Sequence, residues 1–157
     1  MDKIAIFVDV QNIYYTCRQA YGRQFNYRKL WQEVSQLGDI VVAKAYAIDR
    51  NDEQQQKFQS ALQHIGFDIK LKPYIQRSDG SAKGDWDVGI TIDVLEAAPE
   101  VDKVVLLSGD GDFDLLLTKI SEKYQTRTLV YGVPQLTANS LLSATDEFIK
   151  IDQQLLL

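Results

Sequence analysis

The sequence predicts an α/β fold in three layers, with a mostly parallel sheet covered by helices on both faces. Short apolar runs suited to buried strands alternate with longer segments of helical spacing along the chain. The chain has 157 residues, of which 45% are hydrophobic and 25% are charged, which is the usual composition of one globular domain. We therefore predict a single domain over residues 1–157, with right-handed crossovers between its parallel strands.

The first half of the sequence predicts the order β-α-β-α-β. Residues 4–9 form a short apolar run that ends in an acid, which suits a strand buried on both faces. Gly22 interrupts the helical spacing that follows, and Gly38 and Gly66 stand where two later helices should end. We predict helices over residues 11–21, 27–37 and 52–65, and strands over residues 40–48 and 67–71.

The second half continues the alternation after a polar segment. Residues 73–84 are polar and long enough to form a functional loop rather than a tight connection. Beyond them we predict helices over residues 86–97, 113–124 and 137–142, strands over residues 104–107 and 128–131, and an edge strand over residues 148–151. A strand order of 3-2-1-4-5 would make the first strand and the strand over 104–107 neighbours.

The composition excludes several classes of protein. The chain has one Cys and one His, which excludes a disulfide framework and a Cys/His zinc cluster. No run approaches the roughly 18 apolar residues needed to cross a bilayer, and no signal peptide is visible. We therefore expect a cytoplasmic protein with no membrane partner.

The charges are distributed unevenly along the chain. Its net charge is −5, yet residues 85–114 hold nine acids and a single base. Residues 10–32 hold no acid, and their bases alternate with aromatic residues, a pattern typical of contacts with phosphates and bases. A solvated helix with aromatic core residues explains this stretch equally well. The residues concerned are Arg18, Arg23, Arg28 and Lys29, with Tyr14, Tyr15, Tyr21, Phe25 and Tyr27.

Two predicted strands end in acids. The first delivers Asp9, with Asn12 one turn along the next helix, and the strand over 104–107 runs into Ser108, Asp110 and Asp112. Ligands of open parallel sheets bind beyond the carboxyl ends of the strands, where the strand order reverses, so we expect Asp9, Asp110 and Asp112 to converge. Crowded carboxylates repel one another unless a cation intervenes, and hard oxygen ligands suit Mg²⁺ or Mn²⁺.

A third source of acids follows Lys83 and Gly84. Asp87 lies in the first turn of the predicted helix, and Asp93 lies about 240° further round it, so the two cannot share a face. We favour Asp87 as the ligand and Asp93 as a supporting or structural residue. Taken alone, each acid is better explained by a structural role, such as capping a helix or interacting with its dipole. Asp9 is the hardest to explain in this way.

Three segments resemble the motifs of the NYN domain, specifically its LabA-like branch, within the PIN-like nuclease superfamily. They are residues 6–12 (IFVDVQN), Lys83 and Gly84 leading to Asp87 and Asp93, and residues 107–113 (LSGDGDF). The resemblance implies a Rossmann-like PIN fold, a divalent metal ion and ribonuclease activity. It points to the ligands Asp9, Asp87, Asp110 and Asp112, with Asn12, Ser108, Asp85 and Asp93 in support.

The function predicted from these residues is metal-dependent hydrolysis of single-stranded RNA. Lys83, Arg77 and the basic stretch would hold the RNA backbone, while Tyr14, Tyr15 or Trp86 would stack on bases. Whether Asp85 or Asp87 faces the metal stays open, and a homodimer is a candidate assembly because PIN-like domains often pair. The alternatives are a regulatory module that binds RNA without cleaving it and a Mg²⁺-dependent phosphatase.

Overall fold

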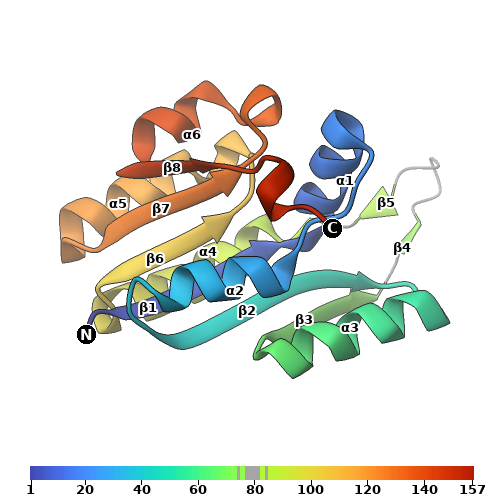
Figure 1. Cartoon of the computed structure of the whole chain (residues 1–157). Coiled ribbons are helices and arrows are strands. Elements are labelled where there is room, and N and C mark those ends of the chain that lie inside the picture. Colours follow the sequence, from blue (N-terminus) through green and yellow to red (C-terminus); the bar gives the residue numbers. More distant parts are fainter. Residues whose placement is uncertain (74, 77–81, 84) are drawn as a thin grey trace.

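The computed structural model contains a six-stranded sheet in the order β3-β2-β1-β6-β7-β8, in which all neighbouring strands are parallel (Figure 1). The structure describes residues 1–73, 75–76, 82–83 and 85–157. The strands are β1 (Lys3–Asp9), β2 (Asp39–Asp49), β3 (Asp68–Pro73), β6 (Lys103–Leu107), β7 (Arg127–Gly132) and β8 (Glu147–Lys150).

Helices cover both faces of this sheet. One face carries α1 (Val10–Tyr21), α2 (Tyr27–Ser35) and α3 (Glu53–Ile65), and the other carries α4 (Asp87–Ala97), α5 (Asp114–Tyr124) and α6 (Asn139–Ala144). The short helical turns are η1 (Ala98–Glu100), η2 (Gly111–Phe113), η3 (Pro134–Leu136) and η4 (Gln153–Leu155). The three-layer α/β fold predicted from the sequence is therefore confirmed.

Strand β1 lies between the two hydrophobic cores. Ile4, Ile6 and Val8 pack into the core beneath α1 to α3, whereas Ala5 and Phe7 pack into the core beneath α4 to α6. All five side chains are fully buried, and burying each large one contributes about 1.5–3 kcal/mol to folding. This packing fixes the strand and hence the position of Asp9 at its end.

The predicted strand order is confirmed and extended by one strand. β8 adds to the outer side of β7 in parallel, where the sequence predicted an edge strand. Within the polar segment, β4 (Ile75–Gln76) and β5 (Ala82–Lys83) pair in antiparallel fashion. Residues 74, 77–81 and 84 lie outside the described part of the chain.

The last residues of the chain close the connection between α1 and α2. Leu156 forms a β-bridge with Phe25, and the N–H of Asn26 donates to the carbonyl oxygen of Leu155 at 2.8 Å. Arg23 Nε donates to the carbonyl oxygen of Leu157 at 2.8 Å. No periodic pattern in the sequence predicts this closure, because it depends on single residues far apart in the chain.

None of the helices in the described part of the chain is long and apolar enough to span a membrane.

Candidate metal centre

The carboxyl ends of β1 and β6 lie side by side. Val8 pairs with Leu107 in the register of the two strands, so the chain leaves both at the same edge of the sheet. The chain runs from β1 through α1 and α2 to β2, which pairs with one side of β1. β6 pairs with the other side of β1. This is the point where the strand order reverses, and it is where open parallel sheets bind ligands.

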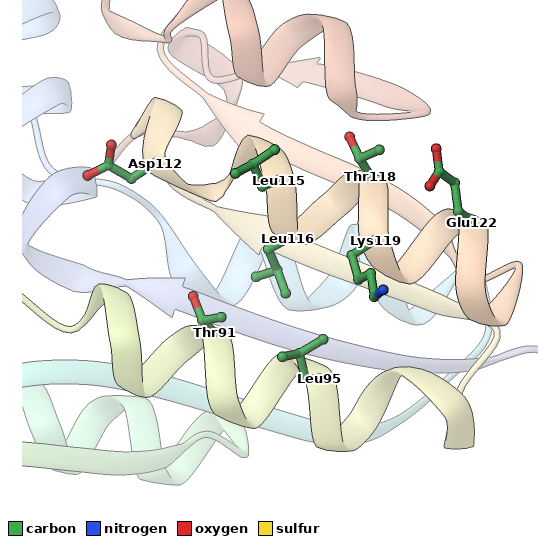
Figure 2. A pocket seen from close by; sticks show the side chains of 8 residues that line it. All are labelled: Thr91, Leu95, Asp112, Leu115, Leu116, Thr118, Lys119 and Glu122. Carbon is green, nitrogen blue, oxygen red and sulfur yellow. The ribbon is translucent and has the colours of Figure 1, made fainter.

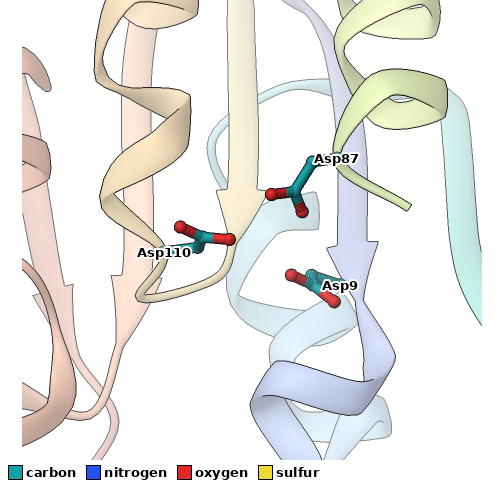
Figure 3. Close-up of side chains that lie close together, drawn as sticks. All are labelled: Asp9, Asp87 and Asp110. Atoms are coloured by element: carbon teal, nitrogen blue, oxygen red, sulfur yellow. The ribbon is translucent and has the colours of Figure 1, made fainter. Parts of the chain in front are cut away.

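Three carboxylates meet at this point. Asp9 ends β1, Asp110 follows β6, and Asp87 begins α4. One carboxylate oxygen from each lies within 4.8 Å of those of the other two, and the three side chains point toward one another (Figure 3). We call these residues the acid cluster. Of the two acids after Lys83 and Gly84, Asp87 therefore enters the cluster and Asp85 does not.

Ser108 and Asn12 hold two of the three acids in place. The Ser108 hydroxyl donates to Asp9 Oδ2 at 3.2 Å, and its oxygen accepts the N–H of Asp110 at 3.1 Å. Asn12 Oδ1 accepts the N–H of Gly109 at 2.9 Å, which ties the first turn of α1 to the loop after β6. Ser108 is fully buried, so this linkage is shielded from water. These contacts agree with the supporting role predicted for Ser108 and Asn12, which stays a prediction.

Asp87 is positioned through the residues before it. Asp85 Oδ1 accepts the Asp87 N–H at 3.2 Å, and the Trp86 indole N–H donates to the Ala47 carbonyl at 2.9 Å. Lys72 Nζ lies 4.4 Å from the centre of the Trp86 ring. Gly89 leaves room for this ring, since an added Cβ would lie 2.6 Å from Trp86 Cε3. Trp86, predicted from the sequence to stack on a base, thus anchors the start of α4.

The electrostatics of the cluster favour a bound cation. Burial raises the pKa of Asp9 to about 6, helped by the nearby charges of Asp110 and Asp85 and opposed by hydrogen bonds from Asn12 and Ser108. Burial, a hydrogen bond with Asp110 and the surrounding acids raise the pKa of Asp87 to about 7. No Lys or Arg whose side chain the structure describes forms an ion pair with these three carboxylates.

The donor set fits a hard divalent ion. The cluster offers only carboxylate oxygens, which are the ligands that Mg²⁺ and Mn²⁺ prefer. Such an ion would supply the positive charge that the three acids lack. The residues that would hold it are Asp9, Asp87 and Asp110.

Asp112, predicted as a fourth ligand, lies outside the acid cluster. Its N–H donates to Asp110 Oδ1 at 2.9 Å, which orients Asp110, while its own side chain is exposed. Together with Leu115 on α5 and Thr91 and Leu95 on α4, it lines a groove between the two helices (Figure 2).

Asp93 is part of a separate ion-pair network. Its Oδ2 lies 3.1 Å from Lys70 Nζ and 3.8 Å from Lys44 Nζ, and it accepts the Tyr46 hydroxyl at 2.7 Å. Burial opposes its ionisation, but the hydrogen bonds from Tyr46 and Lys70 and the two lysine charges outweigh it and lower the pKa of Asp93. Asp93 therefore braces α4 against β2 and β3, consistent with the structural role considered from the sequence.

Replacing Asp93 with asparagine should destabilise the fold by roughly 1–2 kcal/mol at pH 7, since charged hydrogen bonds are lost. A carboxyl whose pKa is lowered on folding stabilises the protein above its unfolded pKa and loses this contribution as the pH falls. Urea unfolding of wild type and variant should therefore differ at pH 7 and converge in acid. Glu96→Gln, at an exposed site on the same helix, is the control. A difference independent of pH would contradict this assignment.

The predicted RNA-binding residues are spread over several surfaces. On the exposed face of α1, Arg18 Nη1 donates to the Tyr14 hydroxyl at 2.8 Å. Arg28 is exposed on α2. Arg23 instead contacts the last residues of the chain. Arg77 and the side chain of Lys83 lie outside the described part of the structure.

Comparison with known protein families decides the classification. The family model of the NYN domain matches residues 3–152, nearly the whole chain. The chain belongs to the NYN domain family. NYN domains form a PIN-like nuclease family, and the acid cluster of this NYN domain is compatible with a divalent metal ion.

Individual proteins resemble this chain to different degrees. The NYN domain is 28% identical to the low amplitude and bright protein LabA of Synechococcus elongatus, over 96% of this chain and 84% of that protein. A crystal structure of a protein of unknown function from Vibrio parahaemolyticus has a TM-score of 0.94 and 55% identity, covering 99% of this chain and 96% of that one. Ribokinase from Giardia lamblia, with a TM-score of 0.52 and 14% identity over 95% of this chain and 57% of its own, shares the fold alone.

Proposed function

We propose that this protein is a metal-dependent ribonuclease that hydrolyses phosphodiester bonds of single-stranded RNA. The observation that carries the proposal is the convergence of Asp9, Asp87 and Asp110 at the switch point of the sheet. Membership of a PIN-like nuclease family supports it. The raised pKa values of Asp9 and Asp87 support it further, because they reflect carboxylates crowded together and partly removed from water.

In this proposal some residues of the site hold the metal ion, and others orient the carboxylates that hold it. A Mg²⁺ or Mn²⁺ ion, when bound, neutralises charge that develops on the phosphate and lowers the pKa of a water molecule. Asp9, Asp87 and Asp110 hold this ion. Hydrogen bonds of Ser108 and Asn12 hold Asp9 and the loop with Asp110 in a fixed relative position. The carboxylates therefore need not reorganise when substrate binds.

The basic and aromatic residues of α1 and α2 are proposed to bind the substrate. Arg18 and Arg28 are exposed and can contact phosphates, and Tyr14 and Tyr15 are exposed to 44% and 48%. Such rings stack on unpaired bases, which favours a single strand over a duplex.

The test is cleavage of an end-labelled single-stranded RNA in Mn²⁺, Mg²⁺ or EDTA. Asp110→Asn should lower the rate at least about 100-fold, since even residues that only support metal ligands contribute 10–100-fold. Asp114→Asn, a matched change in the same acidic stretch and outside the cluster, should cleave like wild type. RNA that is bound but not cleaved in any metal would favour a regulatory module instead. Cleavage retained by Asp110→Asn would rule out the proposed site.

A further inference from the structure

A second concave surface lies at the same edge of the sheet as the acid cluster. It lies between α1, the α1–α2 connection, the end of β2 and the first half of α3, and has a volume of about 450 Å³. Its lining begins at Val10 and Gln11, the two residues that follow Asp9. We call it the α1–α3 groove. The groove and the acid cluster therefore both lie at the carboxyl end of β1.

The floor and one wall of the groove are aromatic. Phe25, Tyr27 and Phe58 form a packed floor, with ring centres 4.9 Å apart for Phe25 and Tyr27 and 5.7 Å apart for Tyr27 and Phe58. Tyr14 and Tyr15 form the wall on α1, and both rings are about half exposed. Because the floor rings hold one another in place, the groove is already formed before a ligand arrives.

The opposite wall is polar and carries positive charge. Gln54 and Lys57 are exposed on α3, and Arg50 is exposed at the end of β2. Asp52, the one acid among the described residues of this lining, accepts the Gln55 N–H at 2.7 Å and so caps α3. The Gln54 side chain makes no hydrogen bond within the described part of the chain, so its amide can serve a ligand as donor and acceptor.

We propose that the α1–α3 groove binds one unpaired nucleobase of the RNA, stacked on Tyr15, with Lys57 facing the adjacent phosphate. This inference rests on the proposed function, since it assumes that the strand at the acid cluster is RNA. The volume suits one small ligand rather than a duplex. Aromatic rings, free amides and cations are the groups that bind unpaired nucleotides.

The experiment measures the Kd of a fluorescent single-stranded RNA in EDTA, so that binding is read without cleavage. A series of RNAs lacks the base at one position each, and wild type should bind one of them about tenfold more weakly than the rest. Tyr15→Ala should weaken binding of the intact RNA by about the same factor and leave the Kd of that one abasic RNA unchanged. Tyr15→Phe keeps the stacking face and should bind like wild type.

Matched lysine variants distinguish RNA binding in the α1–α3 groove from a general effect of positive charge on binding. Lys57→Ala should raise the Kd severalfold, whereas Lys119→Ala removes the same charge from the groove between α4 and α5 and should leave it unchanged. Equal losses in the two lysine variants, or additive effects of Tyr15→Ala and the abasic RNA, would overturn the inference. If the groove is overturned in this way but the wild-type protein still cleaves RNA, the proposed function is retained. Position-specific binding without any cleavage would support the groove and count against the nuclease.

Discussion

Replacing Asp9 with asparagine is expected to stabilise the metal-free protein by up to about 3 kcal/mol at pH 8, while lowering RNA cleavage at least about 100-fold. Burial raises the pKa of Asp9 from 3.8 to about 6. A carboxyl with a raised folded pKa contributes fully to stability below its unfolded pKa and loses that contribution as the pH rises through its folded value. The wild-type protein should thus lose stability between pH 4 and pH 7, and the variant should lose less.

Urea unfolding in EDTA from pH 4 to pH 8 measures this effect. Adding Mg²⁺ or Mn²⁺ at pH 8 should then raise the midpoint of the wild type and have much less effect on Asp9→Asn. Glu96→Gln removes one negative charge at an exposed site. This variant should show the same pH dependence of stability and the same response to metal as the wild type. A variant less stable than wild type at every pH would show that Asp9 serves the fold rather than a metal site.

Replacing Gly109 with alanine is expected to reduce cleavage about 100-fold and the free energy of unfolding by roughly 2–3 kcal/mol. An added Cβ would lie 2.6 Å from the carbonyl oxygen of Leu136 and 3.2 Å from Thr137 Cα. Both are backbone atoms, so the loop between Ser108 and Asp110 must move instead. That displacement would separate Asp110 from the other two carboxylates.

Gly22→Ala is the matched control for this change. Gly22 ends α1 with φ of +64°, and an added Cβ there meets nothing within 4 Å. Alanine should lower stability by about 1 kcal/mol through backbone strain and leave the cleavage rate as it is. Thermal unfolding together with the RNA assay separates the two effects. Equal loss of activity in both variants would show that stability alone limits cleavage.

Much of the fold could be predicted from local patterns. The run of apolar residues at 4–8 can only be buried as a strand, and the structure places it between two cores. The alternation with helices predicts a mostly parallel sheet. The strand order 3-2-1-4-5 was considered because it places the two strands that end in acids beside each other. The pairing of β4 with β5 was not predicted because two-residue strands leave no periodic pattern.

The site was predictable where a strand delivers an acid and less so elsewhere. Asp9 and Asp110 follow buried strands, so their meeting could be inferred from topology. Whether Asp85 or Asp87 joins them could not be inferred from their spacing. In the structure Asp87 joins the cluster, and Asp85 accepts the N–H of Asp87. Asp112 was predicted to join Asp9 and Asp110 from the topology as well as from the motif, but its side chain is exposed in the turn η2 and lies outside the cluster.

The central place of β1 governs the order in which this protein can fold. β1 is the first strand of the chain, yet Ile4 pairs with Lys103, so one edge of this apolar strand stays open until β6 arrives. Closing so long a segment is slow, and an open apolar edge invites aggregation in the meantime. Asp9 can meet Asp110 only after that step. The acid cluster is therefore assembled by the same event that pairs β1 with β6, and a chain in which these strands are still apart carries no assembled site.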